Sequence, residues 1–288
     1  MLVAHLNGAR ILAAIALKGP IYHCPGCGQV VTLRKGTKVT HNFAHKPPVT
    51  CSYAKGETAG HMAAKMLFLN HMLSLPRHAQ VEFPIGNQRA DLYVESKGGN
   101  KYVFEMQHTS ITESEISQRT AAYMQFGAAV TWLPLIDLAK RTDKKSTASG
   151  YVIERYSPKP FERWLDGFHF GKDVWYVDSL SGFLWHGVTE DVMLEKPAAE
   201  WRESGGYLNS VGGYSYRSAR WRKLKLTGPY TLAQLDIARE KRQAFKTKRY
   251  TYPAGWRAVL SPLPGSKPMP LAAQGTAVRA LSIPTKKV

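Results

Sequence analysis

Three cysteines fall close together near the start of the chain, and they constrain its folding more than any other feature. They are Cys24, Cys27 and Cys51, and the 288-residue sequence has no others. The stretch from Ile21 to Cys51 alternates short β-like runs with glycine turns and is too small for an apolar core of its own. An odd, clustered set does not make a disulfide framework. We therefore predict that a zinc ion holds this segment.

The spacing of the ligands fits a tetrahedral site. Cys24 and Cys27 form a CxxC pair on a turn, from which two thiolates can reach one ion, and Cys51 is the third ligand. The fourth is His45 or His41, and we favour His45. A Cys3His site has no open coordination position, so its predicted role is structural.

Two other interpretations of the cysteines are weaker. Buried cysteines beside solvated histidines need a core that this segment lacks. A redox CxxC pair normally follows a strand and opens a helix, whereas here Gly28 and a β-like run to Leu33 follow. The zinc interpretation is preferred to both.

Charge indicates the kind of partner. The formal net charge is +18, and seven Trp and fourteen Tyr accompany it. Such a field favours nucleic acid, although a solvated basic face is the alternative. The first residues lack a basic n-region, and the apolar run from Ile11 to Leu17 is too short to span a bilayer. We expect a cytoplasmic protein.

Hydrophobic periodicity predicts an α-β-β-β-α-β order and a mixed sheet flanked by helices. The expected elements are a helix from Glu57 to Leu75, an antiparallel meander of strands at Val81–Ile85, Gln88–Glu95 and Lys101–Gln107, a helix from Glu113 to Phe126 and a buried strand at Ala128–Leu133. The predicted fold class is α/β, preceded by a small zinc-binding, β-rich segment.

The expected organisation has four parts. They are a zinc-binding segment at 1–55, the core with its following strands at 56–190, a basic aromatic region at 191–257 and a disordered tail at 258–288. The tail is expected to be disordered because it is rich in proline and small residues and has no acidic residue.

Two carboxylates are placed for metal binding. Asp91 lies on the second meander strand, and Glu105 and Gln107 project from one face of the third. Neighbouring carboxylates repel unless a hard divalent cation lies between them, so Mg²⁺ or Mn²⁺ is expected at Asp91 and Glu105. Such an ion supports phosphodiester hydrolysis. The alternative is that each acid is a solvated strand residue.

Two residues of the preceding helix could assist this pair. Glu57 could add a metal contact directly or through water, and His61, one turn later, could orient water or contact phosphate.

Taken in order, these motifs resemble the competence protein CoiA family. The residues that carry the resemblance are Cys24-Pro25-Gly26-Cys27, Phe43-Ala44-His45, Glu57 with His61, Arg89-Ala90-Asp91 and Glu105-Met106-Gln107, and it extends approximately from Ile21 to Trp185. The resemblance implies a PD-(D/E)xK nuclease core of restriction-endonuclease type behind a zinc-binding segment, and a role in handling DNA during natural transformation. Asp91 and Glu105 would then be the metal carboxylates.

The sequence departs from the superfamily at three positions. Gln107 stands where many members of the superfamily have lysine, and CoiA-like sequences also lack that lysine. Lys65 is a candidate to replace it spatially. Ala90 stands where the superfamily name expects proline. Asn42 replaces the first histidine of the family's usual His-Phe-Ala-His, which leaves His45 as the better zinc ligand.

Nucleic-acid contacts are expected from basic and aromatic side chains in two regions. The candidates are Lys65, Arg119 and Tyr123 in the core and Lys246, Lys248 and Arg249 in the carboxyl-terminal region, where cations alternate with aromatic rings. A solvated basic helix followed by a linker is the alternative for the second group.

Three functional hypotheses follow. The first is a Mg²⁺- or Mn²⁺-dependent nuclease, with DNA the expected substrate and Asp91, Glu105, Gln107, Glu57 and His61 at its active centre. The second is a catalytically inactive nucleic-acid-binding accessory protein that recruits recombination or DNA-processing proteins. The third is a zinc-centred interaction module. The sequence leaves open whether the substrate is DNA or RNA, whether it is single-stranded or duplex, and whether cutting is endo or exo. It also leaves open the oligomeric state and a role in transformation, repair or defence.

Overall fold

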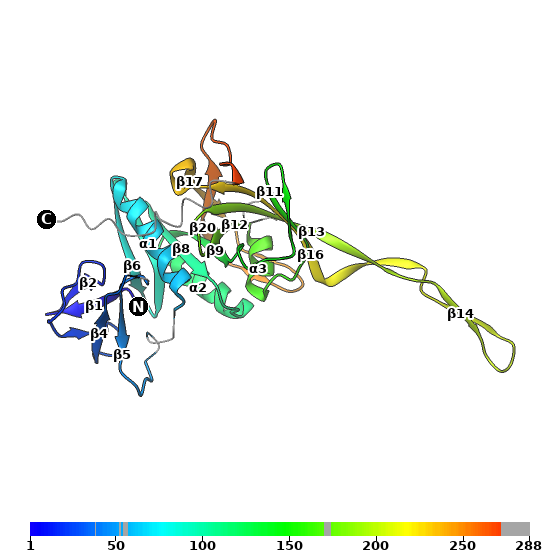
Figure 1. The fold of residues 1–288 in the computed structure, drawn as a ribbon, viewed down its shortest axis with the longest axis horizontal. Helices are drawn as coiled ribbons and strands as arrows, with labels where there is room; N and C mark the ends of the chain where they lie inside the picture. The colour runs from blue at the N-terminus through cyan, green and yellow to red at the C-terminus, as the bar shows by residue number, and fades with distance from the viewer. Residues whose placement is uncertain (38, 52, 54–56, 170–173, 272–288) are drawn as a thin grey trace.

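The amino-terminal segment is a small sheet of its own. In the computed structural model, which describes residues 1–37, 39–51, 53, 57–169 and 174–271, its strands follow the order β2-β1-β3-β4-β5 (Figure 1). They are β1 (Val3–Leu6), β2 (Ala9–Leu12), β3 (Tyr22–His23), β4 (Val30–Arg34) and β5 (Asn42–His45). Its few buried side chains, Tyr22 and Phe43 among them, form a separate small cluster. The predicted β-rich segment is therefore present.

The core begins with the predicted order of elements. These are α1 (Ala59–Ser74), β6 (Arg77–Ile85), β7 (Gln88–Ser96), β8 (Lys101–Gln107), α2 (Glu113–Gln125) and β9 (Ala128–Ile136). Strands β6, β7 and β8 form the expected antiparallel meander, and β8 pairs with β9 in parallel. Pro76 ends α1, because proline cannot continue a helix.

The large sheet extends well beyond these elements. In the described part of the chain it has 11 strands, in the order β10-β11-β16-β13-β12-β9-β8-β7-β6 with β17 and β20 attached. The added elements are β10 (Lys144–Thr147), β11 (Gly150–Tyr156), α3 (Pro160–Phe168), β12 (Val174–Asp178), β13 (Leu184–Lys196), β16 (Tyr214–Tyr230), β17 (Leu235–Arg242) and β20 (Gly255–Pro262). The sheet forks at β9, which pairs in parallel with both β12 and β20.

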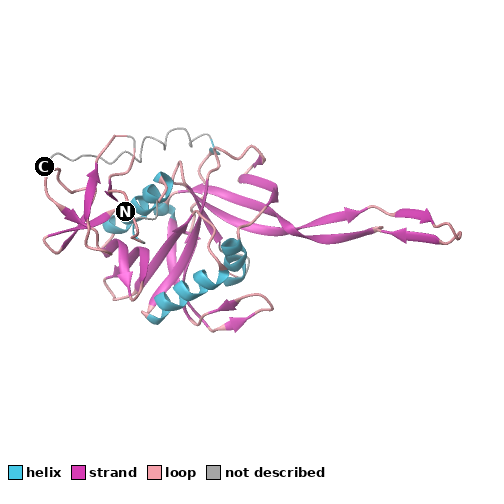
Figure 2. Cartoon of the chain, turned by 90° about the horizontal axis from the view of Figure 1, so that it is seen from below, coloured by secondary structure: helices cyan, strands magenta, loops and turns pink. Residues whose placement is uncertain are grey.

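Helices pack on both faces of this sheet (Figure 2). Helix α1 packs with Leu92, Phe104 and other side chains of one face, whereas α2 and α3 pack with Val103, Trp132 and other side chains of the opposite face. Each strand contributes to both layers because alternate side chains point to opposite faces. The sheet is therefore the middle layer of the core.

The regular alternation breaks at one place in the meander. Ala90 belongs to the α2 side and Leu92 to the α1 side, although residues two apart normally share a face. The β6–β7 pairing is likewise interrupted between Val81↔Leu92 and Phe83↔Ala90, where Glu82 has a left-handed φ of 53°. Glu82 and Asp91 lie opposite each other at this irregularity.

A long two-stranded ribbon projects from the sheet (Figure 1). Strands β13 and β16 pair from Leu184↔Tyr230 out to Lys196↔Tyr214. Beyond them, β14 (Ala199–Arg202) and β15 (Leu208–Val211) continue to the tip. A shorter hairpin consists of β18 (Phe245–Lys246) and β19 (Thr251–Tyr252). It contacts α3, where Trp164 Nε1 donates to the Thr251 carbonyl.

The structure corrects three expectations about the second half of the chain. Strand β13 runs through the expected boundary at 190, and β16, β17 and β20 join the core sheet, so 191–257 is not a separate region. Residues 241–257 contain strands and no helix. Residues 258–262 belong to β20, where Ala258, Val259 and Leu260 are buried, rather than to a disordered tail. The expectation for 272–288 lies outside the described residues.

Candidate functional site

The cysteine segment brings four ligand atoms together. One atom each from Cys24, Cys27, His45 and Cys51 lies within 4.8 Å of the others. Cys24 Sγ lies 3.8 Å from Cys51 Sγ, and Cys27 Sγ lies 3.3 Å from His45 Nε2. Three sulfurs and one imidazole nitrogen at such separations suit tetrahedral zinc. These four residues could hold a zinc ion, and the cluster contains His45 rather than His41.

The backbone around the cluster is shaped for thiolates. The Gly26 amide donates to Cys24 Sγ at 3.3 Å, and the Tyr53 amide donates to Cys51 Sγ at 3.4 Å. Residue 26 must be glycine, because a Cβ there would lie 2.4 Å from the Tyr53 ring. A hydrogen bond from the Gln29 backbone lowers the pKa of Cys27 to about 7, whereas burial raises the pKa of Cys24 to about 11. A bound cation would favour both thiolates.

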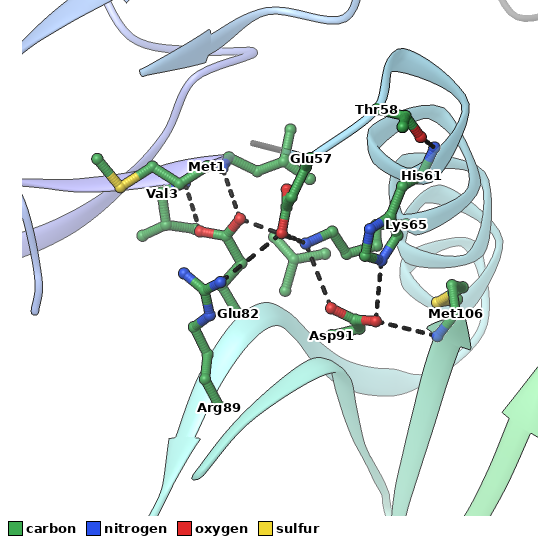
Figure 3. Close-up of polar contacts among 12 residues, drawn as sticks. Met1, Val3, Glu57, Thr58, His61, Lys65, Glu82, Arg89, Asp91 and Met106 are labelled. Carbon is green, nitrogen blue, oxygen red and sulfur yellow. Dashed lines mark hydrogen bonds and ion pairs between the residues drawn. The ribbon is translucent and has the colours of Figure 1, made fainter. Parts of the chain in front are cut away.

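A second site centres on Lys65, whose side chain is completely buried (Figure 3). Its Nζ lies 2.6 Å from Glu57 Oε1, 3.4 Å from Glu82 Oε1 and 3.4 Å from Asp91 Oδ1. Thr58 caps α1 by accepting from the His61 amide at 3.2 Å. The cap fixes the start of α1, on which His61 and Lys65 lie one turn apart on the same side, and Glu57 directly precedes the capping residue.

The charges of this cluster stabilise one another. Burial alone would lower the pKa of Lys65, but Asp91, Glu82 and Glu57 raise it above its usual value. Burial likewise opposes ionisation of Asp91 and Glu82, yet the Lys65 ammonium holds the pKa of both carboxyls below their usual range. Lys65 therefore stays protonated at neutral pH and offers positive charge rather than a base.

Asp91 lies where the β7–β8 ladder ends. Its Oδ2 accepts from the Met106 amide at 3.0 Å and lies 3.0 Å from His61 Nε2 (Figure 3). In return, Glu105 Oε1 accepts from the Asp91 amide at 3.4 Å. Regular pairing stops one step earlier, at Leu92↔Phe104. Carboxylate-to-backbone hydrogen bonds thus take the place of the next ladder step.

The two carboxylates turn toward different helices. Asp91 faces Lys65 and His61 of α1, whereas Glu105 Oε2 lies 2.6 Å from the Arg119 guanidinium of α2. Burial raises the pKa of Glu105 to about 7, against the opposing effect of Arg119. Sequence reasoning correctly placed Asp91 beside Glu105, but their oxygens point to internal cations rather than into a shared gap.

The structure places the other predicted residues as follows. Gln107 is buried, and its amide donates to the Thr109 carbonyl at 2.7 Å. Lys65 and Tyr123 have no exposed surface for a phosphate or base, which corrects the expectation of direct contact. Arg119 is partly exposed but donates to Glu105 and Tyr123.

The three carboxyl-terminal candidates divide between two places. Lys248 and Arg249 are exposed and line a surface cleft, and Lys246 is exposed on β18 outside the residues that line it.

Lys65 is buried among carboxylates, and its Nζ lies 3.4 Å from Asp91. A lysine that replaces the missing motif lysine in space would need such a position.

Sequence reasoning missed two residues of the Lys65 cluster. Glu82 is buried and also accepts from the Leu2 and Val3 amides at 2.7 and 3.2 Å. Arg89 lies 3.7 Å from Glu57 Oε1, and its guanidinium stacks on Tyr53 at 4.1 Å. Counting outward from the Gly86-Asn87 turn pairs Glu82 with Asp91, so the signal for Glu82 was present in the sequence.

Among the described residues, no helix is long and apolar enough to cross a membrane.

These features define a mixed α/β protein with a cysteine–histidine cluster that could hold metal, followed by a sheet-centred core with a buried carboxylate–cation cluster. Comparison with family models narrows the class. Residues 57–155 match the model described as competence protein CoiA, nuclease-like domain, and residues 7–54 match competence protein CoiA, N-terminal domain. The two matches cover about half of the chain, which belongs to the competence protein CoiA family. No curated protein and no solved structure matches it.

Proposed function

We propose that this protein is a metal-dependent nuclease that hydrolyses phosphodiester bonds, with DNA as its expected substrate, on a core of PD-(D/E)xK type. The observation that supports this most is the end of the β7–β8 ladder, where Asp91 and Glu105 exchange carboxylate-to-backbone hydrogen bonds. The family's nuclease-like domain spans both residues. Clusters of buried ionisable groups are frequent at functional sites, and here Lys65 and Arg119 pair the two acids.

The donor set suits a hard divalent cation. Asp91 and Glu105 present carboxylate oxygens, and Glu57 Oε2 is a buried oxygen without a hydrogen-bond partner among the described residues. Oxygen ligands of this kind are those that Mg²⁺ and Mn²⁺ prefer. These three residues would hold the ion, which requires Asp91 and Glu105 to turn from Lys65 and Arg119 toward a shared position. When bound, the ion would polarise the phosphodiester and stabilise the charge that develops on the leaving oxygen.

The remaining residues have distinct roles in the proposal. Lys65, which is protonated, would offset negative charge at Asp91, the task that a motif lysine would otherwise perform. His61 is partly exposed and hydrogen bonds to Asp91, so it can orient water at the solvent side of the cluster. Gln107 would position the end of β8 through its hydrogen bond to Thr109.

The test is cleavage of plasmid, single-stranded DNA and RNA with Mg²⁺ or Mn²⁺, compared with Ca²⁺. We expect Asp91→Asn to lower the rate at least about 100-fold, because a metal ligand contributes several kcal/mol to the transition state and each 1.36 kcal/mol is tenfold. Asp236→Asn, an exposed acid on β17, is the matched control and should leave the rate unchanged. Full activity in the Asp91 variant would refute the assignment.

Asp91→Asn is a cleaner probe than Glu105→Gln. After loss of the Asp91 charge, Lys65 still contacts Glu57 and Glu82, so its charge stays compensated. Loss of the Glu105 charge leaves the largely buried Arg119 without its ion-pair partner, which destabilises proteins by roughly 3–5 kcal/mol. Thermal unfolding of both variants separates loss of chemistry from loss of fold.

A second candidate function is a nucleic-acid-binding accessory protein without turnover. Two observations favour it: Lys65 and Arg119 already compensate the carboxylates, and Gln107 replaces the usual lysine. It predicts salt-dependent binding of nucleic acid with no cleavage under any metal. Cleavage by the unmodified protein that Asp91→Asn abolishes would exclude it.

A further inference from the structure

A cleft lies beside α3, and none of the residues that line it belongs to the Lys65 cluster. Its volume is about 540 Å³, and it lies between α3, the base of the β13–β16 ribbon and the segment 247–252. A neighbouring hollow of about 470 Å³ shares Arg163, Arg249 and Tyr250 with it and reaches Glu113 at the start of α2. The two hollows therefore form one groove, which we call the α3 groove.

The α3 groove is lined by an excess of cations. Five basic side chains contribute to it: Arg163, Arg217, Arg222, Lys248 and Arg249. Asp191 pairs with Arg217 at 2.8 Å and with Arg222 at 3.4 Å. Within the described residues, no carboxylate forms an ion pair with Arg163, Lys248 or Arg249. Three positive charges thus face the groove uncompensated.

Three acidic side chains line the α3 groove, Glu113, Glu162 and Asp166, and the last two hydrogen bond to neighbouring groups. Glu162 accepts from the Tyr156 hydroxyl at 2.5 Å and from the Lys159 amide at 2.6 Å, and burial raises its pKa. Asp166 accepts from the Thr189 hydroxyl at 3.0 Å. With five basic and three acidic residues in its lining, the groove has an excess of positive charge and suits an anion.

Tyrosine rings stand among these cations. Tyr250 is partly exposed and packs edge-on against Tyr252, with ring centroids 6.3 Å apart. The Thr251 carbonyl between them accepts from Ser117 of α2 and Trp164 of α3, so the segment is held to both helices. A ring fixed beside phosphate-binding cations can stack on an unpaired base.

The α3 groove leads toward the candidate active centre. Pro158 and Pro160 line it, and Lys159 between them donates through Nζ to the carbonyl of His108. His108 directly follows Gln107, the last residue of β8. A polymer lying in the groove would therefore reach the end of the strand that carries Glu105.

We propose that the α3 groove binds an unpaired nucleic-acid strand, its phosphates on Arg163, Lys248 and Arg249 and a base on Tyr250, and leads that strand to the end of β8. The proposal rests on the proposed function and deepens it by naming the substrate as single-stranded. A volume of about 540 Å³ is within the usual range of small-ligand sites, roughly 300–1,000 Å³, and suits a few nucleotides rather than a duplex. In a duplex the bases are stacked inside and cannot reach Tyr250.

The test measures fluorescence anisotropy of labelled oligothymidylate, oligouridylate and a DNA duplex, with the full chain and without Mg²⁺ or Mn²⁺. The double variant Lys248→Glu with Arg249→Glu should weaken single-strand binding at least about tenfold. The slope of the logarithm of the binding constant against the logarithm of the salt concentration should become less steep by about 1.4, the contribution of two phosphate contacts to a single strand. Comparison of the two oligomers separates DNA from RNA.

A matched control has the same change of net charge outside the α3 groove. Lys97→Glu with Lys145→Glu reverses two exposed lysines, neither of which lines the groove. It should leave the slope against salt concentration unchanged. Tyr250→Ala should weaken single-strand binding about tenfold and duplex binding little, because stacking needs an unpaired base. Equal effects of the two double variants, or a duplex that binds as well and with the same dependence on Lys248 and Arg249, would overturn the proposal.

The measurement separates this proposal from the nuclease assignment. Asp91→Asn should bind the single strand as tightly as the unmodified protein, because Asp91 lies outside the α3 groove. Loss of cleavage in the variant Lys248→Glu with Arg249→Glu, in which the active centre is unchanged, supports the proposed role of the groove. Groove-dependent binding without any cleavage refutes only the nuclease assignment, whereas cleavage that is insensitive to the groove variants refutes only the groove.

Discussion

Lys65 illustrates how much a single side chain depends on its surroundings. Its exposed fraction is 0%, yet Glu57, Glu82 and Asp91 surround its ammonium. An unpaired buried ammonium would lose its proton rather than stay charged. The helical spacing puts His61 and Lys65 on one stripe of α1, and Glu57 lies just before the helix begins. The spacing did not reveal that the stripe faces the sheet, because spacing alone does not say which face of a helix is covered.

His169 is also buried, but unlike Lys65 it is uncharged in the folded protein at neutral pH. It ends α3, and both ring nitrogens lack a hydrogen-bond partner among the described residues. Burial, with smaller contributions from Arg257 and Arg242, lowers its pKa to about 3. The unfolded chain binds a proton at this histidine near its ordinary pKa of about 6.5, and the folded chain does not. The free energy of unfolding must therefore fall as the pH falls from about 6.5 toward 3.

The measurement is chemical denaturation of the unmodified protein and of His169→Leu. Between about pH 7.5 and about pH 5.5, one proton taken up by the unfolded state alone lowers the free energy of unfolding by roughly 1.4 kcal/mol. His169→Leu should lose that part of the pH dependence. His78→Leu, at an exposed histidine of β6, should keep it. An unchanged slope in His169→Leu would contradict the assigned pKa shift.

At the scale of elements, the amino-terminal half of the core could be predicted from sequence, but the carboxyl-terminal half could not. The meander has clear turn signals and alternating side chains, so β7 and β8 fall within one residue of their predicted bounds. Strand β20 was missed because it lies in a proline-rich stretch and gains its order by pairing with β9 and β17. Pairing between strands so distant in sequence leaves no local signal.

The ribbon was missed for a different reason. Its outer strands carry exposed side chains on both faces, including Trp201, Leu208 and Tyr214. The alternation of polar and apolar residues that marks a half-buried strand is therefore absent there. Because its side chains are exposed, the outer ribbon contributes little to the stability of the fold.

This property of the ribbon can be tested by shortening it. Leu194 and Tyr216 face each other across β13 and β16, so an Asn-Gly turn can join them in place of residues 195–215. None of these residues, all of which the structure describes, is buried. We expect the free energy of unfolding to change by less than about 1 kcal/mol. Leu224→Ala, at a fully buried position of β16, should cost roughly 2–5 kcal/mol.

Thermal unfolding monitored by circular dichroism makes the comparison. A loss in the shortened chain as large as that of Leu224→Ala would mean that the outer ribbon is part of the cooperative fold. Retained stability together with lost nucleic-acid binding would instead assign the ribbon to the binding surface.

At the scale of the whole molecule, several contacts join the metal segment to the core. Arg10 donates to the Val81 and Glu82 carbonyls, and two further connections reach the Lys65 cluster. Glu82 of β6 accepts from the Leu2 and Val3 amides and also contacts Lys65. Tyr53 packs on Gly26 beside the cysteine cluster and stacks on Arg89, which lies near Glu57. Both connections end in the Lys65 cluster. The order of the cysteine segment and the geometry of the carboxylates are thus physically connected.

Removal of zinc should therefore increase hydrogen exchange beyond the cysteine segment as well. The segment has a small apolar cluster and would depend on the metal for its order, as small metal-binding domains do. We expect about one zinc per chain by mass spectrometry and its loss in Cys51→Ser. Hydrogen exchange of the variant should speed up throughout residues 1–51 and locally around Glu82, whose amide partners Leu2 and Val3 would be released. Strands β8 and β9 should stay protected, because each pairs with strands on both sides, even though Leu2 and Val3 pack in the same hydrophobic cluster. Unchanged exchange in a metal-free chain would mean that the segment folds by its apolar contacts alone, and exchange that rises equally in β8 and β9 would mean that zinc stabilises one cooperative unit rather than a docked segment.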